Sequence, residues 1–443
     1  MSNIRLPGWF SNRSYASLGL AAILLAASPA VGFLALFGML VFAAWGILCI
    51  VDLVVGPKRD FLRATRLRPE RLALRMRAEL VYEIENRSGW DVRVGLLETP
   101  VRTLRLVEDE VCASVPARSV ARTQRAVFPV ARGRDEFGDL YFWFENRIGM
   151  IRRRVRVSAV SPFRVYPDLS AVERYRTLHV RNRVIEAGLR RMRLRGQGTE
   201  FESLRDYTVG DAFRSIDWKA TARRMKLMVT QHEVERSQNI VLLLDAGRLM
   251  TARIDEQRKF DYAIGAALSL AAIAGLANDR IGAMAFAADV MYAAAPSQAA
   301  PSRRAMSDAL CDIEPRFEEA NYTRAFSALR QYLKKRSLIV FFTDAIDPIA
   351  QSDLLLEIAT LARRNLVVVV FMNDGAVRSA LDQPVKSALD AARVGVALDL
   401  AHERSVATAR LARAGVHTID VPAKAMSMAL IDEYLKIKGR GAL

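Results

Sequence analysis

Residues 239–245 read NIVLLLD, and residues 337–344 and 366–372 read SLIVFFTD and LVVVVFM. Such continuous apolar runs are typical of parallel strands, which are buried on both faces and so lack polar alternation. Stretches with the length and pattern of helices separate them. Residues 237–443 are therefore predicted to form an open parallel sheet covered by helices on both faces, a Rossmann-like α/β domain.

The predicted strands of this domain are 239–245, 280–287, 337–344, 366–372 and 416–421, and the predicted helices are 257–277, 322–335, 352–364 and 403–414. Two strands end in an acid, Asp245 and Asp344, and ligands of such sheets bind beyond the carboxyl ends of the strands. With the hydroxyl of Thr323, these carboxylates would form an oxygen-rich set of the kind that Mg²⁺ prefers.

Outward from this domain, the N-terminal region carries no charged side chain from Ser14 to Val51. A bilayer needs only about 20 helical residues, and Pro29 interrupts the run near its middle. Residues 1–57 are therefore predicted to form a transmembrane hairpin with spans at about 15–29 and 30–55. A cleaved signal peptide is the rival interpretation, but the apolar run continues well past any plausible cleavage point.

The charges beside the hairpin predict its orientation. Arg5 and Arg13 precede it, and residues 58–77 hold eight Lys or Arg against two acids. The positive-inside rule then places both termini and all soluble domains in the cytoplasm, at the inner (cytoplasmic) membrane. The three cysteines form no CxxC pair, which fits a reducing compartment.

Residues 58–77 are interpreted as a basic linker, and residues 78–167 as a small antiparallel β-sandwich-like domain. Alternating apolar residues and turn signals between short runs indicate this sandwich. The predicted strands are 79–87, 91–99, 119–130, 140–144 and 155–165.

The stretch 147–195 contains fourteen arginines and three acids. Such a stretch attracts nucleic acid or an anionic membrane surface, unless it is only a solvated face. Bases could stack on Phe163, Tyr166 and Tyr175. The predicted anchor and the lack of a nucleic-acid-binding signature argue against that use, so no nucleic acid is expected as a partner.

Residues 168–236 are assigned to a linker and a conspicuous segment, of which residues 196–218 read GQGTEFESLRDYTVGDAFRSIDW. This segment resembles the signature of the bacterial family called domain of unknown function 58. The matching positions are Glu200, Phe201, Leu204, Arg205, Tyr207, Gly210, Asp211, Arg214, Asp217, Trp218 and Arg223.

The resemblance implies a von Willebrand factor A-like fold downstream of the signature. It also implies association with a MoxR-type AAA+ ATPase and with client proteins, as a membrane-bound adaptor in assembly, maturation or stress response. A complete metal site of that fold reads Asp-x-Ser-x-Ser, whereas this chain has Asp245, Gly247 and Leu249. Since both hydroxyl ligands are missing, Asp245, Thr323 and Asp344 form a degenerate set, and neither Mg²⁺ nor another cofactor is expected.

The segment between Glu200 and Arg223 interleaves acids, arginines and aromatic residues. We interpret it as an ion-pair network that fixes two domains against each other, with structural or interaction residues and no catalytic ones. The alternative is a metal-dependent or carboxylate-based hydrolase that uses these acids. No Walker loop, nucleophile elbow or HExxH helix occurs in the chain, so an enzyme is not the expected function.

Overall fold

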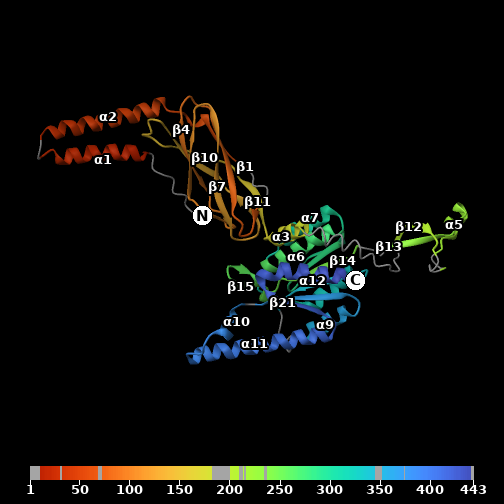
Figure 1. The fold of residues 1–443 in the computed structure, drawn as a ribbon. Coiled ribbons are helices and arrows are strands. Elements are labelled where there is room, and N and C mark those ends of the chain that lie inside the picture. Colours follow the sequence, from red (N-terminus) through yellow and green to blue (C-terminus); the bar gives the residue numbers. More distant parts are fainter. Residues whose placement is uncertain are drawn as a thin grey trace. The chain divides into compact units, whose positions relative to one another are not determined.

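The structure is a computed structural model. It describes residues 10–29, 32–67, 72–181, 200–208, 213, 216–233, 237–344, 352–373 and 375–440. The chain divides into two compact units, Met1–Asp168 and Leu169–Leu443, which are treated separately below (Figure 1).

The first unit begins with two antiparallel helices, α1 (Asn12–Ala27) and α2 (Phe33–Val55), as Figure 1 shows. Helix α1 begins where the hydroxyl of Ser11 accepts a hydrogen bond from the N–H of Ser14, and it ends two residues before Pro29. Helix α2 is long and apolar enough to cross a membrane, and only 11% of its most apolar window is buried. The two helices thus occupy the ranges in which the sequence predicts spans.

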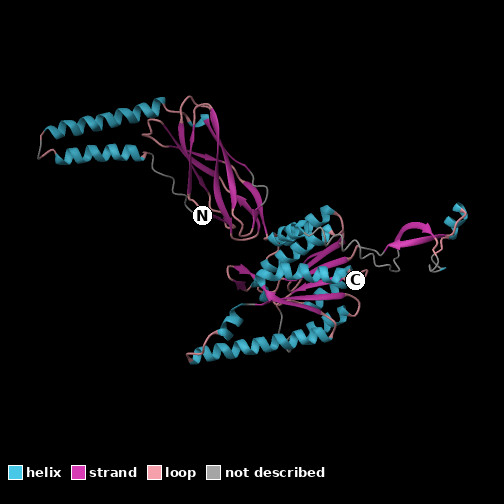
Figure 2. Ribbon diagram, in the orientation of Figure 1, coloured by secondary structure: helices cyan, strands magenta, loops and turns pink. Residues whose placement is uncertain are grey.

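The strands of the first unit form two four-stranded sheets, in the orders β1-β3-β7-β5 and β10-β9-β4-β6, and a three-stranded sheet, β2-β11-β8 (Figure 2). Within the four-stranded sheets all pairings are antiparallel. The strands are β1 (Leu62–Leu67), β2 (Leu72–Ala73), β3 (Ala78–Asn86), β4 (Val92–Glu98), β5 (Leu104–Leu106), β6 (Glu110–Val115), β7 (Ser119–Pro129), β8 (Gly133–Phe137), β9 (Leu140–Asn146), β10 (Arg153–Val157) and β11 (Ser161–Tyr166), and the 3₁₀ turn η1 (Arg59–Phe61) precedes them.

One hydrophobic core joins the two four-stranded sheets. Alternate residues of β3, such as Tyr82 and Ile84, meet residues of β4 and β9, such as Leu96 and Phe142, and all of these are fully buried. The alternation that predicted the strands is therefore the alternation that builds this core.

The basic linker expected at residues 58–77 is wrong, because the structure places β1 and β2 there. Leu62 and Ala64 of β1 point into the core. Arg66 is also buried, and its guanidinium forms hydrogen bonds of 2.8 and 2.7 Å with the carboxylate of Glu98. In the sequence, Arg66 cannot be told from an exposed charge of a linker, because its partner Glu98 lies 32 positions away.

The second unit contains a six-stranded sheet in the order β18-β17-β14-β19-β20-β21. Its elements are α3 (Ser170–Arg181), β12 (Glu200–Asp206), α5 (Trp218–Arg224), β13 (Met228–Glu233), β14 (Asn239–Asp245), η3 (Arg248–Thr251), β15 (Arg253–Ile254), β16 (Gln257–Arg258), α6 (Lys259–Leu276), β17 (Arg280–Phe286), β18 (Val290–Ser297), α7 (Ala300–Asp312), α8 (Tyr322–Tyr332), β19 (Leu338–Phe342), α9 (Ser352–Ala362), β20 (Leu366–Asn373), α10 (Gly375–Asp382), α11 (Ala388–Arg413), β21 (His417–Pro422), η4 (Ala423–Ala425) and α12 (Met426–Gly439).

Five strands of this sheet are parallel, as the sequence predicts, and β18 pairs antiparallel at the edge. Helices cover both faces (Figure 2), so the unit is of the α/β class. Helix α6 also meets the length and composition of a membrane span, but 67% of its apolar window is buried in the unit. It packs against α12 and β14 as a core helix, in agreement with the sequence interpretation.

Several elements of this unit differ from the predicted set, and three of the differences have a clear physical reason. Strand β18 reads VMYAAAPS and has no run of large apolar residues, since it forms the edge of the sheet. Helix α12 follows the last strand, and its Tyr434 and Ile437 are buried. The helix predicted at 403–414 is the end of α11, which begins at Ala388 and whose alanine-rich first half lacks a clear apolar stripe.

Candidate site at the carboxyl edge of the sheet

Asp245 is the last residue of β14, in the middle of the six-stranded sheet, and it is 1% exposed. One carboxylate oxygen accepts a hydrogen bond of 2.8 Å from the N–H of Gly247. The other accepts bonds from the hydroxyls of Thr343 at 2.8 Å and Tyr322 at 3.0 Å. Three donors of the protein itself therefore satisfy this carboxylate.

Burial sets the protonation chemistry of this cluster. Desolvation raises the pKa of Asp245, although the bonds from Gly247, Thr343 and Tyr322 oppose it. Burial and the nearby Asp245 carboxylate raise the pKa of Tyr322 far above its ordinary value. Tyr322 consequently keeps its proton at neutral pH and serves as a donor to Asp245.

Asp344 follows β19 at the same edge, and its side chain is 9% exposed. It forms an ion pair with Lys259, the first residue of α6, and its second oxygen lies 3.8 Å from the guanidinium of Arg404 in α11. Arg404 also forms an ion pair of 2.8 Å with Asp420 of β21. Burial raises the pKa of Asp344, while the Lys259 charge lowers it.

Of the residues suggested for a metal site, Asp245 and Asp344 lie at one edge, close enough for the Asp344 charge to act on the pKa of Asp245. Thr323 is exposed, and it is the preceding residue, Tyr322, that contacts Asp245. A Cβ added at Gly247 would lie 3.0 Å from the Asp245 carboxylate and 3.0 Å from the Cβ of Ala320, so a larger residue here would be in tight contact with both. No group of three or more His, Cys, Asp or Glu suited to a metal ion occurs among the described residues.

The donors of this edge are not among the residues predicted from the sequence: Lys259, Tyr322, Thr343 and Arg404. Thr343 directly precedes a predicted site residue, which is a signal that could have identified it. Lys259, Tyr322 and Arg404 come from three separate helices. Only the assembled sheet brings them to the edge.

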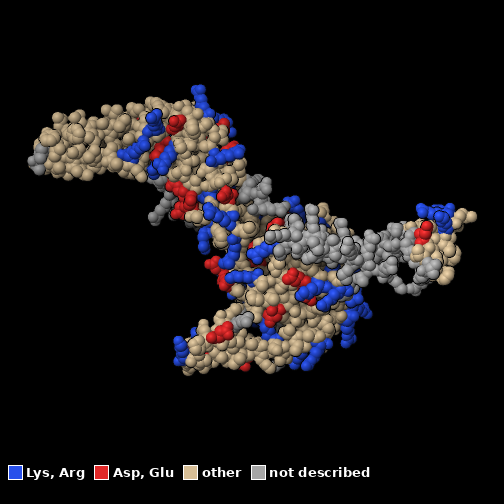
Figure 3. Space-filling view, viewed as in Figure 1, with Lys and Arg blue, Asp and Glu red and all other residues tan. Residues whose placement is uncertain are grey.

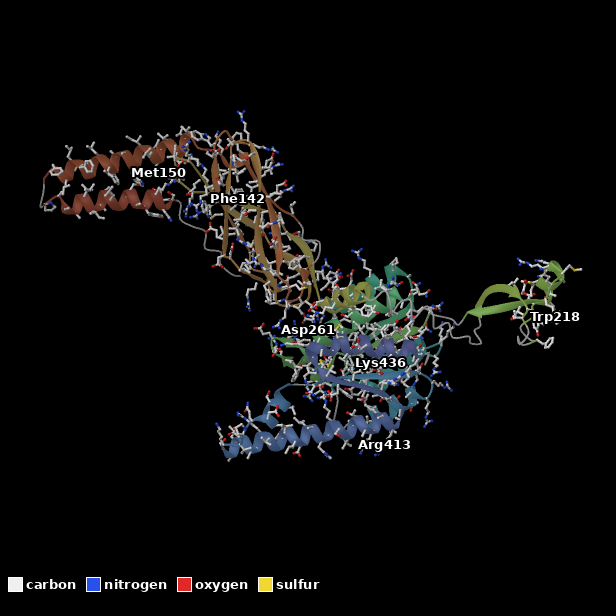
Figure 4. All side chains as sticks on the ribbon, viewed as in Figure 1. Phe142, Met150, Trp218, Asp261, Arg413 and Lys436 are labelled. Carbon is white, nitrogen blue, oxygen red and sulfur yellow. The ribbon has the colours of Figure 1, made fainter. Side chains whose placement is uncertain are left out.

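The signature segment forms the antiparallel pair β12 and β13 with helix α5 between them, as Figure 1 shows. The carboxylate of Asp217 accepts a hydrogen bond of 2.9 Å from the N–H of Ala220 and so caps α5. Trp218 is 66% exposed (Figure 4), and Arg223 is exposed as well. Asp217 therefore caps a helix, and Trp218 and Arg223 lie at the surface of this segment. The interdomain ion-pair network stays a prediction.

Other signature positions are described only in part. Leu204 and Tyr207 are half-buried, and the rings of Tyr207 and Phe213 lie 6.1 Å apart. Glu200, Phe201 and Arg205 lie in β12, and their side chains are outside the described residues, as are Gly210, Asp211 and Arg214 altogether.

Comparison with known proteins gives likenesses of limited length or similarity. Uncharacterized protein YeaD of Bacillus subtilis (strain 168) is 49% identical over 43 residues, which are 10% of this chain and 11% of that protein. The crystal structure of conserved hypothetical protein BatB from Bacteroides thetaiotaomicron has 14% identity and a TM-score of 0.30, covering 45% of this chain and 100% of that chain. The structure of PapD-like domain 7 of human CEP192 has 10% identity and a TM-score of 0.18, and the match covers 23% of this chain and 82% of that chain.

TM-scores of this size define no fold for this chain. The sequence comparison is more specific, because a family model described as "Protein of unknown function DUF58" matches residues 203–405. This range runs from the signature strand β12 through five of the six strands of the sheet to helix α11, and β21 lies beyond it. The chain belongs, through these residues, to the family described as protein of unknown function DUF58.

Proposed function

We propose that this protein is a membrane-anchored, cytoplasm-facing adaptor that binds a MoxR-type AAA+ ATPase and client proteins, in assembly, maturation or stress response. Its anchor would be the hairpin of α1 and α2, which the apolar and largely exposed surface of α2 supports. The many basic residues that follow α2 support a cytoplasmic position for both soluble units.

We further propose that the second unit has a von Willebrand factor A-like fold. Numbered along the chain from β14, the six strands of the sheet have the order 3-2-1-4-5-6. This is a doubly wound order, in which the ligand edge lies at the carboxyl ends of the strands. The acid at the end of the first strand, Asp245, is where such a domain would carry its metal site.

The observation that carries the adaptor proposal is that the two carboxylates at the carboxyl edge of the sheet are already engaged by groups of the protein. Asp245 is bonded to Gly247, Tyr322 and Thr343, and Asp344 is paired with Lys259. Coordination of a cation would require breaking bonds to buried groups, which costs about 1–3 kcal/mol for each group left unsatisfied. An edge whose two carboxylates are already engaged by groups of the protein favours binding of a protein surface over metal-dependent chemistry.

The direct test is capture of a MoxR-type ATPase from the same genome by the full-length protein in detergent, with and without ATP and Mg²⁺. Arg248 is a suitable probe of the edge, because it follows β14 and is 45% exposed in an ion pair with Glu319. We expect Arg248→Glu to reduce capture at least about fivefold, since removing a charged contact of an interface costs on the order of 1–2 kcal/mol or more.

The matched control is Arg364→Glu, an exposed arginine just before β20 and thus at the opposite, amino edge of the sheet. It should leave capture unchanged. Absence of capture in every nucleotide state would contradict the proposal and direct attention to the acids of the signature segment. Equal loss in both variants would show that only net charge matters and would remove the edge as the docking surface.

A further inference from the structure

A cavity of about 570 Å³ lies where α2 ends and the chain enters the first β-strand. Three of its lining residues are apolar and three are basic: Phe10, Leu53, Ile151, Lys58, Arg59 and Arg153. In Figure 3 the visible face of the hairpin is largely tan, and blue side chains with some red ones among them lie at its end near the strands. Such a mixture suits a ligand with an anionic group and an attached hydrocarbon chain.

The cavity wall is held in place by Asp52, which is fully buried at the end of α2. Its carboxylate accepts hydrogen bonds of 2.8 and 2.9 Å from the N–H groups of Met150 and Ile151. Figure 4 shows Met150 beside this end of the hairpin. The loop before β10 is thereby fixed to α2, so the cavity is part of the fold and does not depend on a partner.

The three basic residues have different roles. Arg153 is buried, donates a hydrogen bond of 2.6 Å to the carbonyl of Asp52 and lies 3.5 Å from its carboxylate. The positive charge of Arg153 is therefore balanced by the carboxylate of Asp52 within the cavity wall. A Cβ at Gly56 would lie 2.7 Å from this guanidinium, so glycine allows the approach. Lys58 and Arg59 are exposed and form no ion pair with any described residue, so they supply the unmatched positive charge.

The length of α2 indicates where the cavity would lie relative to a bilayer. Its 23 residues span about 35 Å at 1.5 Å per residue, slightly more than the roughly 30 Å hydrocarbon core of a bilayer. The apolar lining residue Leu53 and its neighbour Val54 are 62% and 73% exposed, whereas the first cation comes three residues after α2 ends. If α2 spans the membrane, the apolar side of the cavity meets acyl chains and the cationic side meets headgroups.

We propose that this cavity binds one anionic phospholipid of the inner leaflet. Lys58 and Arg59 hold the phosphate, and Phe10, Leu53 and Ile151 contact the first part of an acyl chain. The proposal rests on the membrane placement proposed above, and it adds a specific lipid site to the general attraction between basic segments and anionic membranes.

The test uses delipidated full-length protein in a nonionic detergent and native mass spectrometry with two lipids that share their acyl chains. Dioleoylphosphatidylglycerol should bind at least about tenfold more tightly than dioleoylphosphatidylcholine, because two cations face its net charge. Lys58→Gln combined with Arg59→Gln should reduce this preference to about threefold or less.

The matched control is Arg105→Gln combined with Arg134→Gln, which removes two exposed charges from β5 and β8 of the same unit. Arg105 pairs with Phe128 in β7. Strand β1, which follows the cavity, begins at Leu62, which pairs with Asn86 of β3, and Asn86 pairs with Ser119 of β7. These positions are nine residues apart along β7, or about 30 Å. The control should keep the full preference for the anionic lipid.

An equal affinity of the wild type for both lipids would overturn the proposal, and so would a full preference in the variant of Lys58 and Arg59. Displacement of the lipid by about 10 mM inorganic phosphate would show a site for free phosphate instead. The anchor is checked separately by sedimentation of membranes after a carbonate wash. A wild type that is released by the wash contradicts the proposed membrane placement, whatever its lipid preference.

Discussion

At the scale of single residues, the carboxylate of Asp245 links three segments at the carboxyl edge of the sheet. It joins the end of β14 to the start of α8 through Tyr322 and to the end of β19 through Thr343. All three groups lie in or next to the core formed by the central strands. Removal of the carboxylate would take away the acceptor that the hydroxyls of Tyr322 and Thr343 and the N–H of Gly247 share.

We expect Asp245→Ala to lower the free energy of unfolding of the second unit by about 2–4 kcal/mol, because two hydroxyls and an N–H lose their acceptor. The measurement is the urea midpoint for labelling of Cys311, which is buried in α7 of the same unit. Asp289→Ala is the control, since Asp289 forms an exposed ion pair with Arg324 and should leave the midpoint unchanged. A midpoint of Asp245→Ala equal to that of the wild type would refute this structural role.

The raised pKa of Asp245 gives a second prediction, for Asp245→Asn. Burial raises the native pKa above the ordinary value of 3.8, so the native state holds this proton to a higher pH than the unfolded chain does. The stability from this group is therefore full below about pH 3.8 and is lost as the pH rises through the native pKa. Asparagine cannot ionise, so it avoids this loss.

The unfolding free energy of Asp245→Asn relative to that of the wild type should therefore increase with pH, by at most about 1.4 kcal/mol per pH unit. Labelling of Cys311 in urea at several pH values from about 4.5 to 7.5 measures the difference. A difference that stays constant, or that decreases with pH, would mean that the native carboxyl ionises as readily as the unfolded one.

At the scale of elements, a buried ion pair connects β1 to a strand of the opposite sheet. The guanidinium of Arg66 bonds to Glu98 of β4, to the carbonyls of Gly138 and Ala159, and lies 4.6 Å from the ring centre of Phe137. Both side chains of the pair are 2% exposed or less. The strand is therefore fixed to the opposite sheet by a group that its own sequence marks as polar.

Glu98→Ala should destabilise the first unit by about 3–5 kcal/mol, because Arg66 would be left as an uncompensated buried charge. Amide hydrogen exchange across β3 should then become faster. Replacement of both residues, Arg66→Met with Glu98→Leu, should restore most of the protection, since apolar residues of similar volume need no partner. Glu85→Ala, which removes an exposed pair with Arg87, is the control and should leave exchange unchanged.

These elements show how far the sequence predicts the structure. Strands β14, β19 and β20 were predictable, because a strand buried on both faces needs an unbroken apolar run, such as the one ending in Asp245. Strand β1 was not, because Arg66 is made compatible with the core only by Glu98, from another sheet. The position of Asp245 at the candidate site followed from the shared direction of parallel strands and from its place at the end of one, whereas its partner Tyr322 depends on how α8 packs.

At the scale of the whole molecule, the three cysteines report on three different environments. Cys49 is buried in α2, Cys311 is buried in α7, and Cys112 is exposed in β6 of the first unit. Burial and the nearby Glu110 raise the pKa of the Cys112 thiol, which slows its reaction with maleimides but leaves it reachable. Labelling of Cys112 thus reports on the β-strand unit, and the buried Cys49 and Cys311 serve as controls that react only when the protein is unfolded.

Labelling of spheroplasts with a membrane-impermeant maleimide tests the proposed topology of two spans. Gly32 lies in the turn between α1 and α2, and a Cβ added there meets no atom within 4 Å, so Gly32→Cys introduces a thiol without strain. We expect this thiol to react in intact spheroplasts, because a hairpin with cytoplasmic ends exposes its turn outside. Cys112 should react only after lysis, at about pH 8, and Cys49 and Cys311 only after denaturation. Reaction of Cys112 in intact spheroplasts would place the β-strand unit outside the cell and would exclude an ATPase of the cytoplasm as its partner.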